Sequence, residues 1–249
     1  MQRRPQLEIV KAGNEYVPLL GLEVKASPKS ERLGIIGSSG GSALMAADAC
    51  LRAAGAAVEW MVVTDRACGL EHWSREAGHQ THRLQYGNAA AFSMEAHALF
   101  KAAGCRDVLM FYTRRVATPL IDDLHVWNIH PSLLPAFAGL RGVEDAWKAK
   151  VAIFGATLHR VDEGLDTGPI RAQVAAPLQQ NQNLERLQRL SYLQKTWLTM
   201  TWFCMVTGRD AAAASVPCEP GVALAWPGLP DPFYTAYCDW VAREEQSVV

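Results

Sequence analysis

Membrane-spanning runs and secretion features are absent from this sequence of 249 residues. No run of about 18 consecutive apolar residues, the length typical of a transmembrane helix, occurs in it. The first ten residues, MQRRPQLEIV, contain two arginines without an apolar segment behind them, so we expect neither a signal peptide nor a membrane partner. These absences predict a cytoplasmic protein.

Paired cysteines and metal-ligand spacings are also absent. The six cysteines lie far apart in the sequence, and none belongs to a CxxC pair: Cys50, Cys68, Cys105, Cys204, Cys218 and Cys238. A zinc site or a disulfide framework needs closer or more regular spacing. We therefore expect free thiols and no bound metal.

Charge of one sign is not concentrated in any segment. The chain has 24 Lys and Arg against 25 Asp and Glu, a formal net charge of -1. Nucleic-acid-binding proteins carry a basic patch or stripe, so we expect no nucleic-acid partner and favour a small-molecule substrate. A GxSxG nucleophile motif is missing as well, which argues against a covalent acyl-enzyme.

Apolar residues are plentiful, at 49% of the chain, and from Arg32 onward they alternate between strand and helix patterns. The runs read as strands are 33–37, 58–63 and 108–112, and the helices between them are 40–55 and 89–103. Strands separated by helices predict an α/β fold, a mostly parallel sheet with helices on both faces. Sites in such folds lie at the carboxyl ends of the strands.

The second half of the chain adds a strand pair and a long helix. We expect strands at 153–161 and 171–178 and a helix at 184–207. The helix carries a stripe of leucines and aromatic residues, and such a stripe indicates core packing rather than a ligand site.

The two ends of the chain stand outside this pattern. Leu7 to Val24 predicts a short β-hairpin of two strands around a turn, and a short amphipathic piece follows Phe233 near the other end. We expect three parts: an N-terminal extension at 1–31, a catalytic domain at 32–210 and a C-terminal tail at 211–249.

The stretch NIHPSLLPAFAG, 128–139, combines an amide, an imidazole and a hydroxyl without helical periodicity. Asn128 and His130 are two residues apart, so along an extended segment they point to the same side. An amide and an imidazolium together can stabilise the oxyanion of a tetrahedral intermediate. With a carboxylate from the acidic loop that ends in Asp166, they predict acyl-group chemistry by direct transfer.

The motifs NIHPSLLP and GATLHRVDEGLDTGPI resemble the folate-dependent formyltransferases, and among them the phosphoribosylglycinamide formyltransferases. The resemblance implies a Rossmann-like formyltransferase fold, 10-formyltetrahydrofolate as co-substrate and no metal. It also implies roles for three residues: Asn128 would hold the formyl oxygen, His130 would be the catalytic acid, and Asp166 would set the pKa of His130 and position a water.

The same resemblance implies where the folate binds. Two segments would contact the pterin ring: Arg114, Arg115, Val116 and Ala117 in one, and Asp162, Glu163, Gly164 and Leu165 in the other. Thr157 stands where the family has a small hydroxyl residue near the catalytic water. For His159 two roles stay open, in the chemistry or in packing beside the site.

The acceptor side departs from the family pattern. The Gly-rich turn GSSGGSAL places Gly41, Ser42 and Ala43 at a helix start that could cradle a phosphate, but Ala43 stands where the family has Asn. The family's phosphate-binding Arg has no counterpart in YGNAAAFSMEA, and its ribose-binding Glu has none between Leu187 and Phe203. These departures predict an amine acceptor other than glycinamide ribonucleotide.

Alternative functions stay open from the sequence. The nearest is a genuine phosphoribosylglycinamide formyltransferase of purine biosynthesis. A formyltetrahydrofolate hydrolase is disfavoured because Pro131 stands where its motif has a second His. A catalytically inactive folate-binding protein is disfavoured by the intact trio, and an oxidoreductase by the incomplete GxGxxG spacing. The protein is expected to be a monomer or a homodimer.

Overall fold

The computed structural model describes residues 32–179, 182–209 and 221–246, so the predicted hairpin at 7–24 lies outside the described residues. The strands are β1 (Arg32–Gly37), β2 (Glu59–Thr64), β3 (Gln80–Arg83), β4 (Asp107–Phe111), β5 (His125–His130), β6 (Ile153–Arg160), β7 (Ile170–Pro177) and β8 (Leu224–Trp226). The helices are α1 (Ser42–Ala53), α2 (Gly69–Glu76), α3 (Ala89–Ala102), α4 (Leu120–Asp123), α5 (Gly142–Lys148), α6 (Leu184–Val206) and α7 (Phe233–Gln246).

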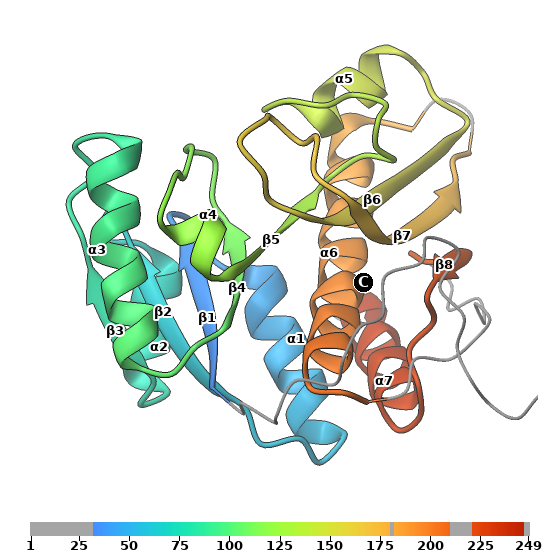
Figure 1. The fold of residues 1–249 in the computed structure, drawn as a ribbon. Coiled ribbons are helices and arrows are strands. Elements are labelled where there is room, and N and C mark those ends of the chain that lie inside the picture. Colours follow the sequence, from blue (N-terminus) through green and yellow to red (C-terminus); the bar gives the residue numbers. More distant parts are fainter. Residues whose placement is uncertain (1–31, 180–181, 210–220, 247–249) are drawn as a thin grey trace, which may run out of the picture.

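The described strands form one sheet in the order β3-β2-β1-β4-β5-β6-β7-β8 (Figure 1). Strands β3, β2, β1, β4 and β5 pair in parallel, whereas β6, β7 and β8 are antiparallel to their neighbours. The chain order reverses direction across the sheet between β1 and β4, the place where ligands bind in open α/β sheets. The prediction of a Rossmann-like α/β fold with a mostly parallel sheet is confirmed.

Local signals in the sequence set several helix ends. Asn88 caps α3, its side chain accepting a hydrogen bond of 2.9 Å from Ala91 N, and Asn183 caps α6 in the same way. Gly55 follows α1 with φ 79, a left-handed conformation that glycine adopts without strain. This is the glycine that the sequence indicated as the end of the first helix.

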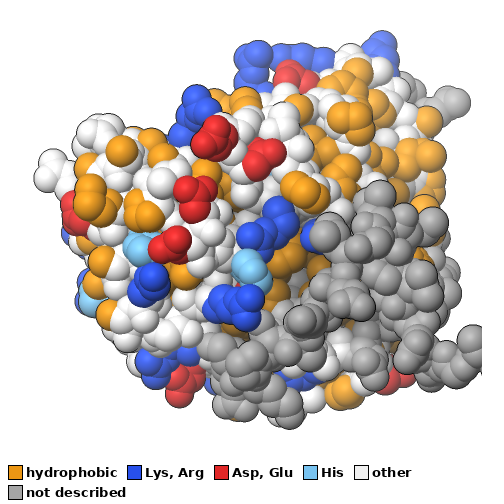
Figure 2. All heavy atoms as spheres, in the orientation of Figure 1, with side chains coloured by type: hydrophobic (Ala, Val, Ile, Leu, Met, Phe, Trp, Pro, Cys, Tyr) orange, Lys and Arg blue, Asp and Glu red, His pale blue; other side chains and the backbone are white. Residues whose placement is uncertain are grey.

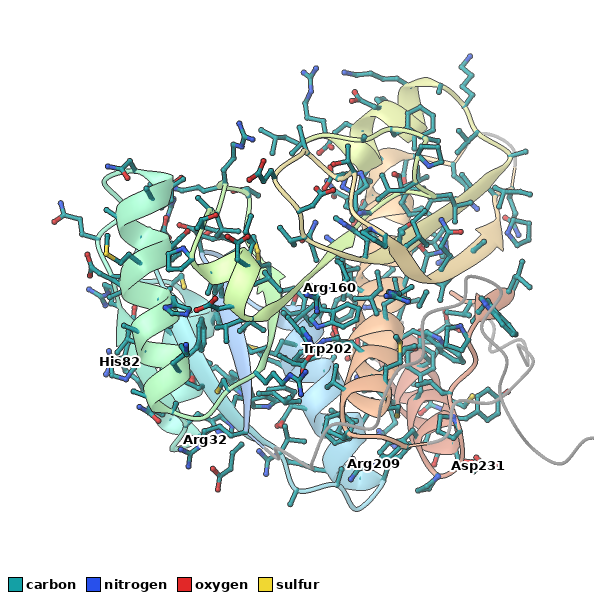
Figure 3. The ribbon with its side chains drawn as sticks, in the orientation of Figure 1. Arg32, His82, Arg160, Trp202, Arg209 and Asp231 are labelled. Carbon is teal, nitrogen blue, oxygen red and sulfur yellow. The ribbon has the colours of Figure 1, made fainter. Side chains whose placement is uncertain are left out.

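Two apolar clusters cover the two faces of the sheet, as predicted. One cluster packs α1, α6 and α7 against it, and the other packs α3 and α4. In the first, Trp202 of α6 stacks on Trp60 of β2 with ring centroids 6.4 Å apart (Figure 3). The aromatic stripe of α6 is therefore core packing, as the sequence indicated.

The described part of the predicted C-terminal tail belongs to the same core. Strand β8 pairs with β7, and the Tyr237 hydroxyl of α7 donates a 3.0 Å hydrogen bond to Leu193 O of α6. The rings of Tyr237 and Trp197 also meet edge to face at 4.9 Å. The expected division between 210 and 211 therefore does not separate two hydrophobic cores.

Several short elements were not predicted: α2, β3, α4, α5 and β8. Strand β3 has no fully buried residue, and the helices α4 and α5 are four and seven residues long. Periodicity rarely reveals elements this short, because about two turns of helix or a strand of three or four residues leave little repeat to detect.

The surface mixes charges of both signs on the face that Figure 2 shows, with a few Lys and Arg side chains gathered near its centre. Figure 3, in the same orientation, places Arg160 there, and its guanidinium lies 4.9 Å from the centroid of the Trp127 ring. No helix of the described residues is long and apolar enough to cross a membrane. Cys50, Cys68, Cys105 and Cys204 are free thiols.

Candidate active site

Two neighbouring strands bring four polar side chains together at the carboxyl half of β5. In the antiparallel pair β5–β6, Asn128 lies opposite His159 and His130 lies opposite Thr157. Residues opposite each other share a face of the sheet, and so do residues two apart along a strand. All four side chains therefore project from the same face.

Asp166 completes this group from the loop between β6 and β7. Its Oδ2 is 3.2 Å from His130 Nδ1 and accepts a 2.9 Å hydrogen bond from Gly139 N. Its Oδ1 is 3.5 Å from Asn128 Nδ2 and 3.6 Å from His159 Nε2. The three residues predicted to be catalytic thus meet around one carboxylate.

Both ring nitrogens of His130 face hydrogen-bond acceptors. Nε2 lies 2.8 Å from Phe137 O and Nδ1 faces Asp166, so only the doubly protonated ring donates to both at once. Burial of the ring, 4% exposed, lowers the pKa of His130, while Phe137 O and Asp166 raise it and only partly offset the burial. The protonated ring therefore gives up its proton more readily than an exposed imidazolium does.

Asp166 itself stays ionised. Burial raises the pKa of its carboxyl group, but the hydrogen bonds from His159 and Gly139 and the nearby charge of His130 outweigh this and lower it. Asp166 adopts φ 56, a left-handed conformation that Asp tolerates better than most residues. This conformation turns the carboxylate back from its loop toward β5.

His159 orients Asn128. Its Nδ1 lies 2.8 Å from Arg160 O, which can only accept a hydrogen, so Nδ1 is the donor. Nε2 lies 3.2 Å from Asn128 Nδ2 and 3.6 Å from Asp166 Oδ1. These contacts match the packing role that the sequence left open for His159.

Thr157 is buried, 0% exposed, and its hydroxyl is fully used. It donates to Ser132 O at 2.7 Å and accepts from Leu134 N at 3.0 Å and Gln173 Nε2 at 3.0 Å. Its contacts support the loop after His130, and the role expected for it near the catalytic water stays a prediction. Gln173, which also donates to Leu134 O, was missed because its role depends on the pairing of β6 with β7.

The two segments predicted to bind the pterin lie against each other. Arg115 Nη2 donates a 2.9 Å hydrogen bond to Glu163 O, which joins the loop after β4 to the loop after β6. Asp162 accepts hydrogen bonds from Gly164 N and Thr167 Oγ1, so the second loop is fixed internally. Leu165 is 53% exposed and is free to contact a ligand.

Ala117 and Val116 anchor the first of these segments. Ala117 N donates a 2.8 Å hydrogen bond to Ser93 Oγ of α3, and Val116 packs against the apolar cluster on that face. Arg114, in contrast, turns away: its Nε lies 2.9 Å from Asp65 Oδ2 at the end of β2. The structure therefore separates two neighbouring arginines that the sequence treated as one pair.

The Gly-rich turn lies at the carboxyl end of β1, as expected. Gly41 has φ 72, and a side chain there would come within 2.9 Å of Leu70. Ser42 begins α1 and is exposed, whereas Ala43 points into the core, 6% exposed. These three predicted acceptor residues lie in the turn after β1 and at the start of α1, and β4 separates β1 from the strand of His130.

Two residues of α6 that follow each other have different surroundings near this site. Gln194 is buried and donates to Phe154 O at 3.3 Å and Gly221 O at 3.2 Å, so it holds backbone. Lys195 is partly buried; burial lowers its pKa and Glu144 of α5 raises it. Its charge also lowers the pKa of His130. The sequence reading missed Lys195, because one lysine in a long helix gives no signal.

The fold and the site together indicate an enzyme that transfers acyl groups. An amide, an imidazole and an ionised carboxylate meet at a parallel strand's carboxyl end, with direct general acid–base chemistry available to them. Sequence comparison agrees: the profile of the formyl transferase family matches residues 32–201. The chain belongs to this family.

Among curated relatives, the chain is similar to phosphoribosylglycinamide formyltransferase of Bacillus subtilis (strain 168), with 40% identity over 119 residues, 45% of this chain and 60% of that protein. It is also similar to the trifunctional purine biosynthetic protein adenosine-3 of Bos taurus, with 32% identity over 170 residues, 64% of this chain and 17% of that protein. The chain thus spans less than two thirds of the length of these relatives.

Solved structures show the same likeness. The structure of glycinamide ribonucleotide transformylase 1 from Geobacillus kaustophilus matches with a TM-score of 0.64 and 29% identity, covering 71% of this chain and 97% of that one. The corresponding enzyme from Symbiobacterium toebii matches with a TM-score of 0.64 and 28% identity, covering 78% of this chain and 93% of that one.

Proposed function

We propose that this protein transfers the formyl group of 10-formyltetrahydrofolate directly to a primary amine. The observation that carries the proposal is the convergence of Asn128, His130 and Asp166, with the Asp166 carboxylate 3.2 Å from His130 Nδ1. Membership of the formyl transferase family supports the formyl group as the acyl unit.

The amine nitrogen forms a bond to the formyl carbon, the bond from that carbon to the folate nitrogen breaks, and one proton passes from the amine to the folate nitrogen. His130, protonated, stabilises the oxygen of the tetrahedral intermediate, delivers its proton to the folate nitrogen and regains one from the amine, while the ionised Asp166 stabilises the imidazolium. Asn128 donates its amide hydrogen to the same oxygen.

We assign the donor to the joined loops. The segments 115–117 and 162–166 meet through Arg115 and Glu163, and Asp166 connects the second segment to His130. A reduced folate bound between them would present its formyl group to the trio. No group of His, Cys, Asp and Glu suited to a metal occurs in the described residues, and the proposed chemistry uses none.

For the acceptor, we propose glycinamide ribonucleotide. The names of the relatives and of the similar structures favour it over the different amine that the departures from the family pattern predicted. Another amine is the second candidate, favoured by two observations: Ala43 points into the core, and Gln194 is held by backbone carbonyls.

A steady-state assay with 10-formyltetrahydrofolate and glycinamide ribonucleotide decides between the two candidates. A kcat/KM above about 10⁴ M⁻¹s⁻¹, ordinary for an enzyme on its own substrate, supports glycinamide ribonucleotide. A much lower value, with tetrahydrofolate released rapidly on another amine, supports the second candidate. Absence of transfer to any amine, while His130→Ala and the unmodified protein bind folate equally well, contradicts the proposal.

A further inference from the structure

Arg114 crosses the end of the strand from which the Gly-rich turn emerges. Strand β1 lies between β2 and β4, and Gly37 at its end pairs with Thr64 of β2 and Phe111 of β4. Arg114 follows β4, yet its guanidinium contacts Asp65, which follows β2. Because neighbouring strands are about 4.8 Å apart, this ion pair spans the whole width of β1.

Asp65 fixes a second arginine in the same place. Its carboxylate accepts two hydrogen bonds from Arg66, at 2.9 and 3.0 Å, besides the contact with Arg114 at 2.9 Å. The Asp65 side chain is 1% exposed, whereas the two arginine side chains are 49% and 39% exposed. Burial raises the pKa of Asp65, but the charges of Arg66 and Arg114 outweigh burial and lower it, so the carboxylate stays charged and orients both.

Two tyrosines line the same position. The guanidinium of Arg114 lies 4.5 Å from the centroid of the Tyr86 ring, which restricts its orientation. The Tyr112 hydroxyl is buried beside the Asp65 carboxylate, and burial together with Asp65 raises the pKa of Tyr112.

The backbone beside this group is built for close approach. Ser39 O accepts a 3.1 Å hydrogen bond from Leu70 N at the start of α2, and a side chain at Gly69 would lie 3.1 Å from Gly40 Cα. The turn is therefore held by α2, and α1 starts directly after it, its first backbone N–H groups directed at the end of β1.

We propose that Arg66 and Arg114, oriented by Asp65 across the end of β1, bind the phosphate monoester of the acceptor together with the turn 38–41. Two guanidinium groups against one carboxylate leave one net positive charge, and guanidinium groups suit phosphate oxygens. This inference deepens the proposed function and rests on it. Arg66 and Arg114 would also supply the positive charge that the segment YGNAAAFSMEA lacks, from the loops after β2 and β4.

The test measures binding of ribose 5-phosphate, with neutral ribose as its control, by calorimetry on the full chain. We expect the unmodified protein to bind ribose 5-phosphate and not ribose. Arg114→Gln and Arg66→Gln should each weaken that binding by roughly 10-fold or more, the loss typical of a charged hydrogen bond. Arg75→Gln is the matched control, because Arg75 pairs with Glu71 on α2 away from the end of β1, and it should change binding less than about 2-fold.

Urea unfolding of the same variants reports folding, and its midpoint should stay close to that of the unmodified protein. Equal binding of ribose 5-phosphate by both arginine variants and the unmodified protein would overturn the inference, as would equal binding of ribose or no binding of the phosphate at all. If the arginines control phosphate binding but no amine is formylated, the proposed function fails and the phosphate site stands. If glycinamide ribonucleotide is formylated with unchanged KM by both variants, the site fails and the function stands.

Discussion

The two sides of the candidate site are built differently. On the β5–β6 side, Asn128, His130, His159 and Asp166 are hydrogen-bonded to one another, and His130 is 4% exposed. On the β1–β2–β4 side, one buried carboxylate orients two half-exposed arginines above a glycine turn. The first arrangement suits proton transfer, which needs fixed distances in a dry place, and the second suits capture of a charged substrate from water.

Loss of the imidazole tests the catalytic side and should have the largest effect. His130→Ala, or Asp166→Asn, should lower kcat by about 10² or more, because these groups act mainly on the transition state. Folate binding should stay within a few-fold. The control is His125→Ala, at the other end of β5 and paired with Asp107, which should keep kcat within about 3-fold. Near-normal turnover by His130→Ala would remove His130 from the chemistry.

The next effect concerns stability on the same side. Thr157→Val leaves Ser132 O, Leu134 N and Gln173 Nε2 each without one hydrogen bond, so it should lower the free energy of unfolding by about 1–3 kcal/mol. Thr199→Val is the control, since Thr199 is equally buried and only donates to Lys195 O within α6. Urea unfolding should show the larger loss for Thr157→Val. Equal losses would mean that Thr157 does not support the loop.

The pH dependence of stability should also trace to the catalytic side. The folded-state pKa of His130 is lowered, so the unfolded chain binds a proton more readily, and stability falls as pH drops below the ordinary His value of about 6.5. The lowered pKa of Asp166 adds stability above its ordinary value of about 3.9, which is lost as pH falls further. Urea unfolding of His130→Gln should show a flatter decline between pH 7 and 5. An unchanged slope would contradict this.

The sequence predicted the catalytic side far better than the acceptor side. Asn128 and His130 belong to one short motif on one strand, and Asp166 to a second motif, so local patterns sufficed. The acceptor side draws Asp65, Arg66 and Arg114 from the ends of two strands that are not neighbours in the sheet. Their meeting depends on the sheet order, which a linear pattern does not contain.

The same limit applies to Thr157. The sequence did not reveal that its hydroxyl supports the loop after His130, because this contact depends on its register opposite His130 on β5 and Gln173 on β7. The parallel sheet and its covering helices were predictable, because buried strands and amphipathic helices repeat over many residues. Side-chain direction at the ends of strands follows from tertiary contacts alone.

The smallest expected effect separates the donor side from the acceptor side most directly, because it concerns two adjacent residues. Arg115 donates to Glu163 O on the donor side, whereas Arg114 contacts Asp65 on the acceptor side. Arg115→Gln should therefore raise KM for 10-formyltetrahydrofolate by roughly 3- to 10-fold, the cost of about one modest hydrogen bond, and leave KM for the acceptor unchanged. Arg114→Gln should do the reverse, with kcat near normal in both variants since neither touches His130. Steady-state kinetics with each substrate varied in turn measures this, and an equal effect of both variants on both KM values would mean that the two sides are not separate.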